Sequence, residues 1–81
     1  MDGRKMQDIT VKQKILSTIV TINDGRLDYL SLANLDKIVT FILQTNDLFK
    51  AVDFAKRLDR RVHVEDIIYI VDIINEVLNH E

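Results

Sequence analysis

The chain has 81 residues, of which 47% are hydrophobic and 30% charged, and its formal net charge is −2 at pH 7. This length allows one domain, and a domain so small buries only a modest fraction of its surface. The chain has no cysteine, which excludes disulfides, and His63 and His80 lie too far apart in sequence to suggest a metal site. Small domains are normally reinforced by disulfides, metals or oligomerisation. We therefore expect association with a partner chain and no cofactor.

The composition also narrows the setting in which the chain works. No apolar run approaches the 18 residues that a membrane span needs, so we expect no membrane association. Residues Met1 to Gln7 lack the apolar core of a signal peptide. We predict that residues 1–7 form a disordered tail before a single domain over residues 8–81. The slightly acidic charge does not fit a protein that wraps DNA with its whole surface.

A first helix is predicted to begin at Asp8 or Thr10, because a short side-chain oxygen can accept from the orphan N–H groups of a first turn. Most of its apolar residues share one helical face. These residues are Val11, Ile15, Leu16, Ile19 and Val20. The sequence Asn23-Asp24-Gly25 is a strong turn signal, so the helix should end there and residues 26–30 should form an ordered loop.

The segment from Ser31 to Leu58 contains neither glycine nor proline. One helix over this range would be roughly 42 Å long at about 1.5 Å per residue, far longer than the usual helix. Its apolar stripe changes face near Thr45. In the first half the stripe consists of Leu32, Leu35, Ile38, Val39, Ile42 and Leu43. In the second half it consists of Phe41, Leu48, Ala51, Val52, Ala55 and Leu58, while Phe49 stays with the first face.

A helix whose two halves turn opposite apolar faces needs different cover for each half. Two short flanking helices of one chain cannot easily cover both, so we predict a continuous central helix that a second chain crosses near Thr45. The alternative is a break within Gln44-Thr45-Asn46-Asp47, which would give a four-helix bundle of a single chain.

The last part of the chain begins with a basic loop at Arg60-Arg61. The alternation in Val62-His63-Val64 is typical of a short strand. Glu65 and Asp66 then begin a final helix, because acidic residues favour the positive end of the helix dipole. Its broad apolar face contains Ile67, Ile70, Val71, Ile74, Val77 and Leu78. The β-branched density also suits a strand, but the polar residues follow a helical period.

This order of elements resembles the histone-fold family. The sharpest match is Val62-His63-Val64-Glu65-Asp66-Ile67-Ile68 placed after Ala55-Lys56-Arg57-Leu58, and the resemblance covers residues 8–79. Within the family the chain is most similar to the TBP-associated factors of TFIID, of the subunit-thirteen type, and next to the Spt-type subunit of SAGA. The Asn23-Asp24-Gly25 loop also fits the subunit-thirteen type. Two positions depart from the family pattern: Asp59 stands where a loop arginine is usual, and His63 stands where threonine often caps the last helix.

The resemblance implies an all-α histone fold that forms a handshake dimer. It also implies an obligate heterodimer with another histone-fold subunit, within a larger nuclear complex for transcription initiation. Asp66 matches the aspartate that pairs with a loop arginine in the family, so Arg60 or Arg61 must take that place, and Arg61 is the partner we expect. Residues 62–64 should form a β-bridge to the partner's first loop, which corresponds here to residues 25–27. The expected dimer interface consists of Leu35, Ile38, Ile42, Phe49, Val52, Val62, Val64, Ile67, Ile70 and Ile74.

Other functions are also open. A DNA-binding histone-like module of the CCAAT-factor or kinetochore type would bind phosphate through surface arginines, and a salt titration of duplex binding would identify it. Its candidate contacts are Arg26, Arg57, Arg60 and Arg61. A monomeric helical adaptor is a third reading. We expect no enzyme, because the sequence has no nucleophile–base spacing, phosphate-binding glycine loop or metal motif.

Overall fold

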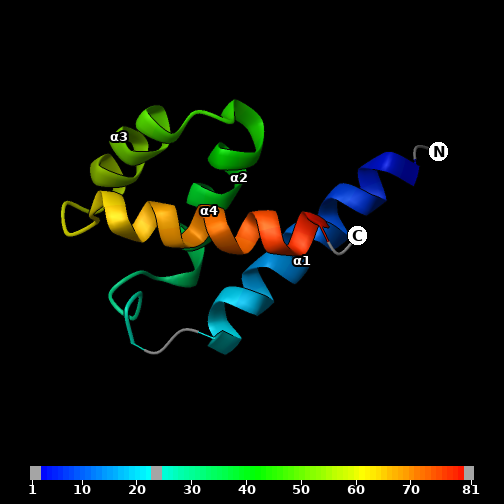
Figure 1. Ribbon diagram of the computed structural model, residues 1–81, viewed down its shortest axis with the longest axis horizontal. Coiled ribbons are helices and arrows are strands. Elements are labelled where there is room, and N and C mark those ends of the chain that lie inside the picture. Colours follow the sequence, from blue (N-terminus) through cyan, green and yellow to red (C-terminus); the bar gives the residue numbers. More distant parts are fainter. Residues whose placement is uncertain (1–2, 23–24, 80–81) are drawn as a thin grey trace.

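The computed structural model describes the backbone of residues 3–22 and 25–79, and side chains from Thr10 onward. Within those residues the chain forms four helices: α1 (Gly3–Ile22), α2 (Leu32–Thr45), α3 (Leu48–Leu58) and α4 (Val64–Asn79). Helix α1 packs against α2 and α4, and α3 packs against the same two helices. The helices therefore close a ring around one core, with α4 crossing in front of α2 in Figure 1. The all-α prediction is confirmed.

Helix α1 begins at Gly3, earlier than the predicted start at Asp8 or Thr10. Residues 3–7 are the first residues of this helix, while residues 1–2 lie outside the described part. The helix ends at Ile22, as the turn signal predicts. Gly25 follows with φ of 98°, a left-handed conformation that glycine adopts without steric cost.

The central segment is broken, and the prediction of one continuous helix from Ser31 to Leu58 is wrong. Helix α2 ends at Thr45 and α3 begins at Leu48, which leaves Asn46 and Asp47 as a two-residue hinge. The chain turns there, and α3 packs against α2. In Figure 1 the turn lies at the top of the molecule, between the two green helices. The four-helix alternative is the one that forms.

Local hydrogen bonds explain why the break falls at this place. Asn46 has φ of 56°, in the left-handed region, and its backbone N–H donates to the carbonyl of Ile42 as a C-cap. Asparagine tolerates this conformation better than most residues. The side chain of Asp47 accepts from the backbone N–H of Lys50 at 3.2 Å, which caps the start of α3. The segment lacks glycine and proline, which would favour a continuous helix. Two adjacent capping residues, Asn46 and Asp47, nevertheless end one helix and begin the next.

The turn also accounts for the apolar stripe that changes face near Thr45. Because α3 folds back, its apolar side faces the same core as the apolar side of α2, and no second chain is needed to cover it. Phe41 of α2 and Phe54 of α3 stack across the turn with ring centroids 4.3 Å apart. The most deeply buried large side chains come from three of the four helices and one loop: Ile15, Ile19, Ile38, Val39, Val62, Ile67 and Ile70.

The loop between α3 and α4 is not a strand, and no strand occurs in the part of the chain that the structure describes. Val62 is fully buried and Val64 is the first residue of α4. The backbone N–H of Val62 donates to the carbonyl of Asp59, and its carbonyl accepts from Lys56 Nζ at 2.8 Å. These bonds make a tight turn. The alternation in residues 62–64 therefore arises because Val62 is buried in the core and Val64 begins α4, and not because the segment is a strand. None of the described helices is long and apolar enough to cross a membrane.

Candidate interaction surface

The two longer connections of the fold meet on one side of the molecule. They are residues 25–30, between α1 and α2, and residues 59–63, between α3 and α4. Together with the first two turns of α4 they form a surface that we call the loop junction. Some of its polar contacts are local, and the contacts of Tyr29 and Tyr69 join residues that are distant in sequence.

Tyr29 and Asp66 form a partly buried contact between the first loop and α4. The Tyr29 hydroxyl donates to Asp66 Oδ2 at 2.6 Å, and Asp66 is only 8% exposed. The same carboxylate oxygen accepts from the backbone N–H of His63 at 3.2 Å, one residue before α4 begins. Asp66 therefore closes the first turn of α4 in the manner of a capping-box acid and also holds the first loop. Burial, and then the bond to Asp66, raise the pKa of Tyr29 well above its usual range.

Arg61 pairs with Asp59 and not with Asp66, so the predicted Arg61–Asp66 ion pair is wrong. Its Nε lies 3.0 Å from Asp59 Oδ1, and the second guanidinium contact, to Oδ2, is 2.8 Å. The hydrogen bonds from Arg61 lower the pKa of Asp59, and the same contacts raise the pKa of Arg61. The guanidinium also donates to the Tyr29 carbonyl at 3.3 Å and lies 5.2 Å from the Tyr29 ring. Asp59 is only two residues from Arg61 along the chain and is therefore the nearer carboxylate. Asp66 already accepts a hydrogen bond from the Tyr29 hydroxyl.

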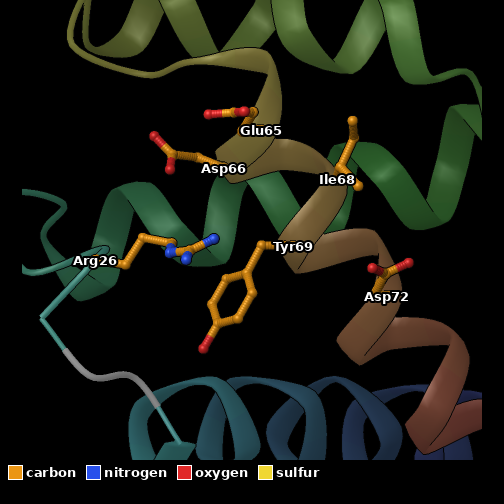
Figure 2. Close-up of a pocket in the computed structure, with 6 residues that line it drawn as sticks. All are labelled: Arg26, Glu65, Asp66, Ile68, Tyr69 and Asp72. Carbon is orange, nitrogen blue, oxygen red and sulfur yellow. The ribbon is translucent and has the colours of Figure 1, made fainter.

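A second arginine–tyrosine contact borders an open cleft beside α4. Arg26 reaches from the first loop, and its guanidinium carbon lies 5.0 Å from the ring centroid of Tyr69, a cation–π geometry. Figure 2 shows this side chain pointing toward Tyr69, below the acidic start of α4. The cleft has a volume of about 390 Å³ and is lined by Arg26, Glu65, Asp66, Ile68, Tyr69 and Asp72. The first loop is therefore tied to α4 at two places.

Most of the predicted dimer-interface residues lie inside the chain's own core. Seven of the ten are buried: Leu35, Ile38, Ile42, Val62, Ile67, Ile70 and Ile74. Val52 is half-buried, Val64 is 44% exposed, and Phe49 is 82% exposed. Phe49 is thus the one large aromatic side chain of that set that the folded chain presents to solvent. A partner that touched the buried seven would have to replace parts of this chain.

The four candidate phosphate contacts do not form one free cationic patch. Arg57 pairs with Asp53 at 3.1 Å, Arg61 pairs with Asp59, and Arg26 lies over Tyr69. Arg60 is exposed. Neighbouring carboxylates thus offset much of the positive charge of this region, which does not favour the DNA-binding reading.

Sequence reasoning missed the bond between Tyr29 and Asp66. The acidic residue three positions after His63 was a visible signal for helix capping, but nothing in the sequence joined it to a tyrosine in the first loop. A second surface was also missed: a shallow apolar groove between α1 and the start of α2. Its apolar lining is Leu16, Val20 and Leu32, of which Val20 is 58% and Leu32 62% exposed.

Comparisons of the chain with protein-family models, with curated proteins and with solved structures found no match.

Proposed function

We propose that this chain is a protein-interaction subunit of the histone-fold type. In this proposal it pairs with a different histone-fold chain and serves as scaffold in a nuclear, TFIID-like complex for transcription initiation by RNA polymerase II. The pairing is a heterodimer, and the function is assembly without catalysis.

The observation that carries this proposal is the complementarity of the two loops. The resemblance assigns residues 25–27 and 62–64 to opposite sides of a contact between two chains. In this structure residues that flank these two segments meet within one chain: the Tyr29 hydroxyl donates to Asp66 in the first turn of α4 at 2.6 Å, and Arg61 donates to the Tyr29 carbonyl. Loops that fit each other in this way can form the same contacts across a dimer.

The distribution of apolar residues gives further support. Phe49 is 82% exposed, and aromatic residues are enriched in protein interfaces. Leu32, Val20 and Ile22 are also more than half exposed. The seven buried interface residues become available when a partner chain takes the place of this chain's own second half.

The test is co-expression with candidate histone-fold chains, with co-purification and solubility as the readouts. We expect one such chain to co-purify at a 1:1 ratio. Phe49→Glu should abolish this while leaving the helical circular dichroism of the isolated chain unchanged, because Phe49 is exposed in the unpaired state. Asn75→Glu, an exposed position on α4, is the matched control and should keep the partner.

Two results would count against the proposal. One is that none of the histone-fold chains co-purifies. The other is that Phe49→Glu retains the partner as well as the Asn75→Glu control does. Ile42→Glu is not a useful variant here, because Ile42 is 7% exposed and a charge at that position would unfold the chain itself.

A further inference from the structure

We propose that this chain forms an exchanged dimer with a second copy of itself. The chain opens at Asn46 and Asp47, and the half that contains α3 and α4 packs against α1 and α2 of the other copy. This exchange requires only this chain. It therefore does not depend on the heterologous partner proposed above.

The hinge has the features that promote exchange. It is two residues long, and Asn46 is the one non-glycine residue with positive φ within residues 3–22 and 25–79. Side chains disfavour this left-handed conformation, asparagine less than most, and short hinges under strain invite exchange between copies. An open hinge, helical or extended, has negative φ at Asn46 and relieves the strain. The absence of glycine and proline from Ser31 to Leu58 also permits helical continuation through the hinge.

The contacts between the two halves suit exchange because each one joins a residue before the hinge to a residue after it. Tyr29 bonds to Asp66, Arg61 to the Tyr29 carbonyl, and Arg26 lies over Tyr69. The stacked rings of Phe41 and Phe54 also lie on opposite sides of the hinge. All of these contacts can form between two copies with the same partners and geometry. The closed monomer and the exchanged dimer then differ mainly at the hinge.

Neither half can remain open alone. Opening would expose Ile38 and Ile42 of α2, and Ala51 and Ala55 of α3, all of which are at most 7% exposed in the closed chain. Exposure of so much apolar surface is unfavourable. An opened chain must therefore either close again or bind a second opened copy, and protein concentration decides between these outcomes.

The first experiment measures the mass of the full chain by analytical ultracentrifugation over a dilution series. Asn46→Ala should strengthen the dimer, because alanine tolerates left-handed φ less well than asparagine and favours a helix. Asn46→Gly should weaken it, because glycine adopts that φ freely. We expect a change on the order of tenfold per hinge for Asn46→Ala, and a dimer contains two hinges. Equal dimer constants for the two variants would overturn the proposal.

The second experiment shows whether the dimer is exchanged or merely side by side. One population carries Arg26→Cys and the other Tyr69→Cys, and the chain has no other cysteine. After unfolding and refolding of the mixture at dimer-forming concentration, a short bismaleimide should link the two populations covalently. A stable dimer without this cross-link would overturn the proposal. If Asn46→Ala fails to fold, a variant that lacks Asn46 and Asp47 takes its place, because without these residues the chain cannot fold back. This deletion variant should be a dimer at every concentration. A folded monomer of the deletion variant would overturn the proposal.

Discussion

Replacement of Tyr29 by phenylalanine removes one hydroxyl and leaves the ring in place. The structure predicts a large effect for so small a change, because the hydroxyl donates at 2.6 Å to Asp66, a carboxylate that is 8% exposed. Without it, Asp66 Oδ2 keeps the His63 N–H at 3.2 Å and loses its shorter bond. A hydrogen bond to a charged group contributes about 1.5–3 kcal/mol. We therefore expect Tyr29→Phe to lower the free energy of unfolding by about 2 kcal/mol.

The assay is thermal and urea unfolding at one fixed low protein concentration, followed by circular dichroism. For a domain of this size, about 2 kcal/mol corresponds to a fall in Tm of roughly 8–16 °C. Tyr69→Phe is the matched control, because the Tyr69 hydroxyl lies 3.4 Å from the Ile22 carbonyl and is exposed; it should change stability by less than about 0.5 kcal/mol. Equal effects of the two substitutions would refute the importance of the loop junction.

The stability difference between the parent chain and Tyr29→Phe should also depend on pH. The pKa of Tyr29 is raised in the folded chain from its ordinary 10.0, so folding favours the protonated phenol. The stabilisation from Tyr29 is therefore complete below pH 10 and is lost as pH rises toward the raised pKa. We expect the stability difference between the parent chain and Tyr29→Phe to be constant at neutral pH and to shrink above pH 10. A difference that is independent of pH would show that the phenol does not bind Asp66.

Three further predictions test other parts of the fold. The pKa of Asp59 is lowered from 3.8 by its bonds to Arg61, so the stabilisation that this pair gives is present above pH 3.8 and lost at lower pH. Asp59→Asn should therefore make acid unfolding less steep, and an unchanged acid profile would contradict this. Ile38→Ala should cost about 2–5 kcal/mol in urea unfolding because Ile38 is fully buried, whereas Phe49→Ala should be nearly neutral; similar costs would refute the burial pattern. Asp47→Ala should cost about 1 kcal/mol through loss of the α3 cap, and no measurable change would show that the cap is absent.

Much of the secondary structure could be predicted from periodicity and turn signals. The end of α1 at Ile22 and the helical character of α4 followed from Asn23-Asp24-Gly25 and from the period of the polar residues. The break at the middle was harder, because helix propensity favours continuity and a cap is only a local signal. The swing of the apolar stripe near Thr45 was the correct clue. It fits either a chain that crosses a partner or a chain that folds back, and sequence periodicity cannot distinguish them.

The loop junction was partly visible in the sequence. Asp66 was correctly singled out as a structural carboxylate at the start of the last helix, but its partner was wrong. A pattern of residue types gives the chemistry of a site without the distances between loops, so Arg61 seemed the natural partner. Only the fold, which brings residues 25–30 beside residues 59–63, places the Tyr29 hydroxyl closer to Asp66 and leaves Arg61 to Asp59.

The turn at Asn46 and Asp47 is the feature on which the fold and the exchange both depend. It can be tested by one distance in the monomer at low concentration, between spin labels on Ala33→Cys near the start of α2 and Arg57→Cys near the end of α3. The folded-back chain predicts a distance far shorter than the roughly 36 Å that 24 helical steps would give. A single distribution centred near that length would contradict the turn, and with it the closed four-helix core.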